Sequence, residues 1–228
     1  MNKQKAVLGL LVFGFVVLFA CSSMAQVVLK KIGANVVVAD TLNPVTNPVD
    51  IWIAELPKGP TVIFLYSEDT PKYRVRFEMY DSETHKLGHD DRLDDLKPHF
   101  GTISGGTYYL VVTALYTENK TISYKLGCAV ADFDTFRVLG GTGDTFSFNI
   151  TIEGGTTTFL FLLDLSETFN PDIYVYDQGQ KVGWCKNVED LDYIIWEITN
   201  TKNYRVDIVS ANGAGLFWLL KMVYRPSI

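Results

Sequence analysis

The chain has few histidines and little helical periodicity. Only three histidines occur in the 228 residues, and all of them lie between positions 85 and 99. A Ser-His-Asp triad needs a histidine base beside its nucleophile, and no Gly-x-Ser-x-Gly motif is present. The glycine-rich stretch at 140–143 is not followed by the Lys-Ser or Lys-Thr pair of a phosphate-binding loop, so it indicates a turn. We therefore expect that this protein is not an enzyme.

Basic residues are also scarce. The chain has 20 lysines and arginines against 26 acidic residues. Loss of an N-terminal leader would remove Lys3 and Lys5 and no acid, leaving 18 basic and 26 acidic residues, a net charge of −8. An acidic surface argues against nucleic acid and against anionic lipid as partners.

The first 25 residues have the pattern of a secretory signal peptide. Residues 1–5 carry two lysines, and residues 6–20 carry no charge. This uncharged run is shorter than the roughly 20 residues of a membrane-spanning helix, although it continues through Val28, which leaves an uncleaved anchor as an alternative. Cleavage before Cys21 would follow the lipobox of bacterial lipoproteins, and cleavage after Ala25 would follow a small-x-small site. We expect an extracytoplasmic protein that meets the membrane only through a lipid on Cys21, if that cysteine is modified.

The rest of the chain has the period of two that is typical of strands. Val75, Phe77 and Met79 alternate with charged residues, and residues 144–152 alternate in the same way. Asn212 and Gly213 form a hairpin signal between two apolar runs. Only residues 90–96 suggest a turn or two of helix. The pattern predicts an all-β protein of the sandwich or barrel class.

The strand pattern repeats with an offset of 96 residues. Tyr80 and Asp81 fall on Tyr176 and Asp177, and Tyr108 falls on Tyr204. The offset predicts two tandem units. We place a first β-sandwich at 47–128, a second at 131–228, and an N-terminal strand or arm at 26–46. The second unit is expected to be longer near its start, around 140–158, and the two units are expected to behave as separate lobes that a protease could cut near 129–131.

Each unit contains an Asp-x-aromatic start, a Tyr-Asp pair that closes a strand, a polar loop with glycine, and a final hairpin. Asp50 begins the first of these patterns and Asp134 the second. This arrangement resembles the bacterial pre-peptidase C-terminal domain family, which includes the collagen-binding domains of secreted collagenases. The resemblance implies two jelly-roll-type β-sandwiches with non-catalytic attachment or accessory work. Such domains usually follow a protease, and no protease is present in this chain.

A calcium site is one candidate for ligand chemistry. Asp132 and Asp134 flank Phe133, and on an extended chain their carboxylates would point the same way. The resemblance implies calcium near the first strand of a unit, and calcium takes six to eight oxygen ligands. The candidate ligands are Asp132, Asp134, Asp177, Glu189, Asp190 and Asp192. The alternative is that these acids are simply solvated. The three histidines match no closed zinc motif, and a polar loop is the preferred interpretation for them.

Trp184 and two cysteines complete the candidate residues. Trp184 lies in a polar stretch, where an exposed indole could stack on sugar rings or anchor a protein contact, or could instead cap the end of its own sandwich. Export would place Cys128 and Cys185 in an oxidising setting, which leaves two alternatives open: a disulfide between them, or two unrelated buried thiols.

Together these features predict a non-catalytic binding or accessory protein outside the cytoplasm. Its partner would be a protein or a polysaccharide at the cell envelope. A structural envelope lipoprotein within a larger assembly is the alternative hypothesis, and a hydrolase is the third.

Overall fold

The fold of the computed structural model is all-β, as predicted. The structure describes residues 29–67, 75–90, 96–115, 120–166, 168–185 and 191–226. Apart from the 3₁₀ helix η1 (Phe133–Thr135), every regular element in these ranges is a strand. The helical turn predicted at 90–96 lies mostly outside the described residues, and its two end residues belong to strands.

The first half of the chain forms two sheets. One has the strand order β1-β3-β8-β5-β6 and the other β2-β9-β4-β7. The strands are β1 (Leu29–Gly33), β2 (Val36–Leu42), β3 (Val49–Leu56), β4 (Gly59–Tyr66), β5 (Val75–Tyr80), β6 (Lys86–Asp90), β7 (Leu96–Ile103), β8 (Gly106–Ala114) and β9 (Ile122–Val130). Residues 29–46, predicted as a strand or arm, supply β1 and β2, and both pair within these sheets: β1 runs parallel to β3, and β2 antiparallel to β9.

The second half forms two further sheets, with the orders β11-β16-β13-β14 and β10-β17-β12-β15. Their strands are β10 (Arg137–Leu139), β11 (Thr145–Ile152), β12 (Thr156–Asp164), β13 (Asn170–Asp177), β14 (Gln180–Cys185), β15 (Leu191–Ile198), β16 (Lys202–Asn212) and β17 (Gly215–Tyr224). Adding eight to the strand numbers of the first half reproduces both orders, with β1 as the one extra strand. A register shift follows Met79 in β5 and Val175 in β13, at equivalent places.

The extra length predicted around 140–158 is wrong. β3 begins at Val49 and β11 at Thr145, already 96 residues apart. The error came from matching Asp50 to Asp134. Asp50 lies inside β3, whereas Asp134 lies in η1, before β10.

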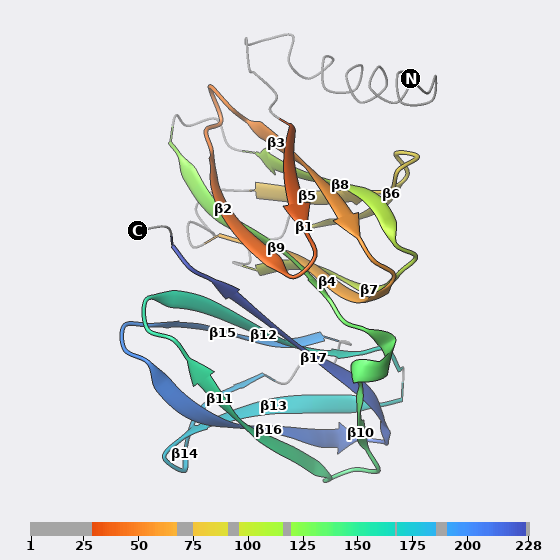
Figure 1. The fold of residues 1–228 in the computed structure, drawn as a ribbon, viewed down its shortest axis with the longest axis vertical. Helices are drawn as coiled ribbons and strands as arrows, with labels where there is room; N and C mark the ends of the chain where they lie inside the picture. The colour runs from red at the N-terminus through yellow and green to blue at the C-terminus, as the bar shows by residue number, and fades with distance from the viewer. Residues whose placement is uncertain are drawn as a thin grey trace.

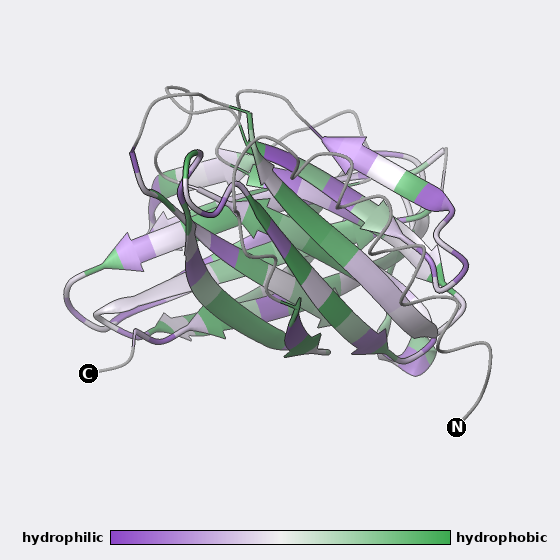
Figure 2. Ribbon diagram, turned by 90° about the horizontal axis from the view of Figure 1, so that it is seen from above, coloured by the Kyte–Doolittle hydropathy of each residue, from purple (hydrophilic) through white to green (hydrophobic). Residues whose placement is uncertain are grey.

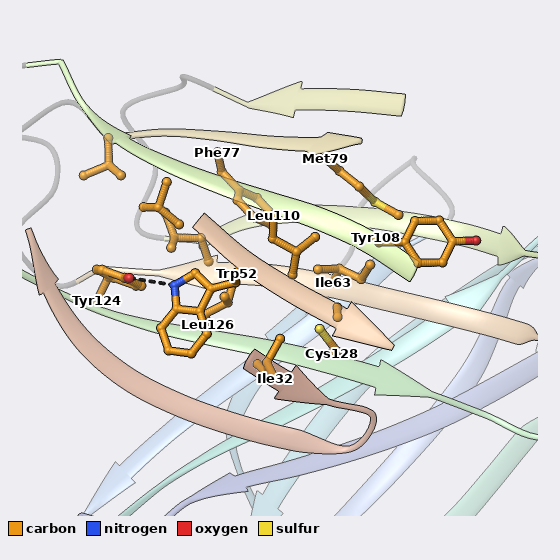
Figure 3. Packing of buried hydrophobic residues seen from close by; sticks show 14 of the residues in the cluster. Ile32, Trp52, Ile63, Phe77, Met79, Tyr108, Leu110, Tyr124, Leu126 and Cys128 are labelled. Carbon is orange, nitrogen blue, oxygen red and sulfur yellow. Dashed lines mark hydrogen bonds between the residues drawn. The ribbon is translucent and has the colours of Figure 1, made fainter. Parts of the chain in front are cut away.

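Three hydrophobic cores separate the four sheets, which lie as layers one above the other (Figure 1). Residues alternate between apolar and polar along many strands (Figure 2), so these strands turn one set of side chains toward a core. The first core packs around Trp52, Phe77 and Leu110 (Figure 3). The second packs around Ile173, Val206 and Phe217.

The third core lies between the two halves of the chain. The Phe64 ring lies 4.6 Å from that of Phe159 and 4.9 Å from that of Phe161, measured between centroids. Both faces of β12 are covered as a result, and all nine of its residues are buried. Ala129 and Ala131 belong to this core. The cleavage expected near 129–131 therefore falls on buried chain, and the two sandwiches share a core instead of forming separate lobes.

Gly127 is required by this central packing. A Cβ added there would lie 2.4 Å from two ring carbons of Phe64. We expect Gly127→Ala to lower the free energy of unfolding by about 1–3 kcal/mol, because an overpacked core must shift its side chains or backbone. Urea denaturation measures this loss. Gly33→Ala is the control, since a Cβ at Gly33 meets nothing within 4 Å. Equal stability of the two variants would contradict the packing.

Candidate functional site

The outward face of the sheet β11-β16-β13-β14 gathers aromatic and charged side chains. Ile173 and Val175 of β13 point into the second core, so Tyr174 and Tyr176, which alternate with them, point outward. This sheet lies at the lower end of the molecule in Figure 1, away from the first half of the chain. We call its outward residues Tyr174, Tyr176, Lys181, Trp184, Arg205 and Asp207 the aromatic face.

Strand register brings these six residues into two rows. Tyr174 lies opposite Trp184 on β14 and opposite Asp207 on β16. Tyr176 lies opposite Lys181 and Arg205. Directly opposed side chains have Cβ atoms about 4.5–5.5 Å apart, so each row is a set of touching neighbours. The register shift after Val175 places Lys181 in the second row.

Cationic side chains lie over the rings of the aromatic face. Lys181 Nζ lies 5.0 Å from the ring centroid of Trp184 and 5.7 Å from that of Tyr174. Arg205 Cζ lies 4.3 Å from the ring centroid of Tyr176. Contacts of this kind are worth about 0.5–1 kcal/mol at exposed sites. They orient the rings without covering Trp184, which remains 60% exposed.

Asp207 is the most buried charge of this face. Its Oδ2 pairs with Arg205 at 3.1 Å, while its Oδ1 is buried and has no hydrogen-bond partner among the described residues. A buried acceptor without a partner costs about 1–3 kcal/mol. Asp207 therefore offers an unused acceptor beside Tyr174.

The structure places Trp184 on β14 with its side chain in solvent. The interpretation that Trp184 caps the end of its own sandwich is therefore wrong. The other tryptophans, Trp52, Trp196 and Trp218, are buried in the three cores. Sequence reasoning missed Tyr174, Tyr176 and Arg205 as partners of Trp184. Their strand alternation was visible, but nothing in it showed which set faces outward.

The described acids of the predicted calcium site are dispersed. A 3₁₀ turn at Phe133–Thr135 replaces the extended chain that would have aligned Asp132 with Asp134. Asp177 pairs with Lys202 at 3.0 Å, which raises the pKa of that lysine. Asp192 is buried in β15 and accepts a hydrogen bond from the backbone N–H of Ile173.

Glu189 and Asp190 lie outside the described residues. Within the described ranges, no group of three or more His, Cys, Asp or Glu side chains could hold a metal ion. The histidines are likewise separated: His85 pairs with Asp81, His89 lies on β6, and His99 of β7 stacks on Phe77 at 4.9 Å.

The predicted disulfide is not formed. Cys128 lies on β9 in the first core, and Cys185 ends β14 in the outermost sheet of the second half. A disulfide needs Cα atoms closer than about 7 Å, and strands on opposite sides of the central core cannot meet that requirement.

The two thiols should differ in reactivity. Cys128 is fully buried, and this burial raises its pKa to about 12, whereas Cys185 is partly exposed. Since the thiolate is the reactive form, we expect native protein to titrate with Ellman's reagent at Cys185, and Cys128 to react only after unfolding. Cys185→Ser identifies the reactive residue. Immediate native labelling of Cys128 would contradict its placement.

A partly buried charge network joins β1 and β2 to the first core. Lys30 Nζ lies 2.6 Å from Asp40 and 2.7 Å from Asp50. Tyr124 donates a hydrogen bond of 2.6 Å to Asp50 and accepts one of 2.9 Å from the Trp52 indole (Figure 3). Burial raises the pKa of Tyr124, and the hydrogen bond to Asp50 raises it further. Partial burial alone would lower the pKa of Lys30, but the carboxylates of Asp40 and Asp50 outweigh this effect and raise it.

This network predicts a loss of stability at alkaline pH. In the unfolded chain tyrosine ionises near pH 10, while folded Tyr124 keeps its proton to higher pH. The raised pKa of Lys30 acts in the same direction, because its stabilising charge is fully present below about pH 10 and is lost above. Urea unfolding at pH 8, 10 and 11 should show falling stability, with a smaller fall in Tyr124→Phe. The same fall in both proteins would contradict the role of Tyr124.

A groove of about 470 Å³ lies at the junction of the two halves. Its lining includes Tyr66, Lys125 and Tyr224. Lys125 Nζ lies over both tyrosine rings, at 5.2 and 5.5 Å, and pairs with Glu197 at 3.0 Å. The lysine thus links the first half of the chain to the second, which is a structural role.

No helix in the described residues is long and apolar enough to cross a membrane.

Comparison with known proteins gives only distant structural likenesses. No family model and no curated protein matches the sequence. The pre-peptidase C-terminal domain of a collagenase from Bacillus anthracis aligns with 46% of this chain and 99% of its own, at 14% identity and a TM-score of 0.39. A putative secreted protein from Eubacterium rectale aligns over 77% of this chain and 69% of its own, at 10% identity and a TM-score of 0.25. The exported protein XepA of PBSX aligns over 86% and 83%, at 11% identity and a TM-score of 0.26. All three TM-scores are below 0.5, so none of these likenesses supports a function for this chain.

Proposed function

We propose that this chain is a non-catalytic binding protein that works outside the cytoplasm and holds its ligand on the aromatic face. The observation that supports this function is the exposure of Trp184, at 60%, beside two further aromatic rings. Exposed aromatic side chains on a rigid scaffold are the usual anchors of binding surfaces. β13 and β16 of the aromatic face line the second core, and β14 pairs along β13, so the rings are held in place before a ligand arrives.

The chain is built as two tandem units of the pre-peptidase C-terminal type. Their shared strand order, their common register shift and the 96-residue offset support this proposal. The aromatic face belongs to the second unit alone. At the equivalent register positions of the first unit, His89 takes the place of Trp184, and Glu78 that of Tyr174.

The proposed location depends on the leader at 1–25, which lies outside the described residues. Intact-mass measurement of the mature protein tests the two cleavage sites. An acylated N-terminus at Cys21 is the expected result, and a mature chain that starts at Gln26 would contradict the lipid anchor. Calcium also stays a proposal, and a higher melting temperature in calcium than in chelator, at matched ionic strength, would support it.

Solid-phase binding to three classes of immobilised polymer tests the function: neutral polysaccharides, acidic polysaccharides and fibrous proteins. We expect binding to at least one class, its loss in Trp184→Ala, and its retention in Val138→Ala. Val138 is a matched control because it is also 60% exposed but lies on β10, in another sheet. Binding to no class, or binding that survives Trp184→Ala, would contradict the proposal.

A further inference from the structure

The aromatic face is an open sheet surface with balanced charge. Three bases and three acids lie on it or at its edge in the described residues: Lys181, Lys202, Arg205, Asp172, Asp177 and Asp207. Two of the bases already pair with acids of the same face, Arg205 with Asp207 and Lys202 with Asp177. A polyanion needs uncompensated cations, and the net negative charge of the chain repels it further. Charge balance therefore favours a neutral ligand.

The carboxylate of Asp207 indicates which chemical group a neutral ligand must present. Asp207 Oδ1 is buried and has no partner in the part of the chain that the structure describes, and the residue is 8% exposed. A hydrogen-bond donor on the ligand would satisfy this oxygen, and hydrogen bonds to charged acceptors are stronger than those between neutral groups. A hydroxyl group supplies such a donor without a charge of its own.

Polar side chains extend the face beyond Asp207. Ser147 and Asn149 of β11 lie opposite Asp207 and Arg205, and both are exposed. The sheet thus offers aromatic rings on β13 and β14, and hydroxyl and amide groups on β11. A ligand that lies across it needs C–H surfaces for the rings, whose faces are electron-rich, and several hydroxyls for the rest.

We infer that the aromatic face binds a neutral, hydroxyl-rich polysaccharide chain, with one sugar ring on Trp184 and a hydroxyl donated to Asp207 Oδ1. This inference rests on the proposed function and names its ligand class. A flat sheet suits a run of sugar residues within a chain, whereas single sugars and chain ends need an enclosing pocket. The groove at the junction of the two halves is lined by other residues and is not part of this site.

Affinity electrophoresis tests the inference, with native gels that contain one polymer each. The neutral probes are hydroxyethyl cellulose, arabinoxylan, galactomannan and soluble starch; the comparison probes are heparin and soluble type I collagen. We expect at least one neutral polysaccharide to retard the protein. Trp184→Ala should weaken that binding about 30-fold or more, as for an anchor residue, and Asp207→Asn about 10-fold, as for one charge-assisted hydrogen bond. Val138→Ala should bind like the parent protein.

The outcomes separate the two proposals. Retardation by heparin or collagen alone, lost in Trp184→Ala, would overturn the neutral polysaccharide and leave the proposed function standing. Retardation by no polymer would overturn both. Circular dichroism of each variant shows whether it folds. If Asp207→Asn proves unfolded, Ser147→Ala and Trp184→Phe test the same face, with weaker binding expected for both and unchanged binding contradicting the inference.

Discussion

Phe159→Ala should destabilise the whole protein by about 3–5 kcal/mol, the usual cost of truncating a buried phenylalanine. The ring is completely buried and lies among Phe64, Tyr66 and Phe161 at centroid distances of 4.6, 5.6 and 6.4 Å. Few groups can move into the space it leaves, because the sheets on both sides are already packed. Guanidinium denaturation followed by circular dichroism measures the loss.

Because this ring belongs to the core between the two halves, both halves should respond together. We expect one cooperative transition in the parent protein and in Phe159→Ala, shifted to lower denaturant in the variant. Phe136→Ala is the matched control, since that phenylalanine is 38% exposed and should cost less than about 0.5 kcal/mol. Two separate transitions in the parent protein would contradict the shared core.

Asp50→Ala should cost about 3–5 kcal/mol, because it removes the buried centre of a network: Lys30 loses one of its two carboxylates and Tyr124 loses its hydrogen-bond acceptor. The Asp50 side chain is fully buried and contacts Lys30, Tyr124 and Asn47. Lys30 would keep Asp40 as a partner, but the Tyr124 hydroxyl would lose its acceptor inside the core.

Glu153→Ala provides the comparison for an exposed pair. Glu153 pairs with Arg225 at 2.9 Å, with both side chains more than half exposed. Such surface pairs contribute about 0–1 kcal/mol. Urea denaturation of the two variants at pH 7 measures the difference. Similar losses in both would show that the network around Asp50 does not hold β1 and β2 to the first core.

The strands can be predicted from the sequence, but the sequence does not show which sheets pack against one another. Alternation identified β5 and β11 because each has one core-facing side. β4 and β12 instead contain continuous apolar runs, which are typical of strands covered on both faces. These two apolar runs indicate a third core between the two halves. The 96-residue repeat alone does not indicate it.

The candidate site was predictable only in part. Trp184 is distinguished in the sequence by its polar neighbours, and the structure leaves it exposed. Tyr174 and Tyr176 alternate with Ile173 and Val175, and either set could have filled a core. The register shift that brings Lys181 beside Tyr176 depends on strand pairing, which no single segment encodes. The calcium ligands were predicted from the family resemblance and from an extended chain at Asp132 and Asp134, which the structure replaces with a 3₁₀ turn.

The ligand should lie over the exposed ring of Trp184, and tryptophan fluorescence tests this contact most directly. Trp52, Trp196 and Trp218 are each no more than 8% exposed, so iodide in solution should quench Trp184 almost alone. With a saturating neutral polysaccharide from the electrophoresis panel, the quenchable fraction should disappear, and Trp184→Phe should show no such fraction with or without polymer. A quenchable fraction that stays unchanged while the polymer is bound would place the binding site elsewhere on the molecule.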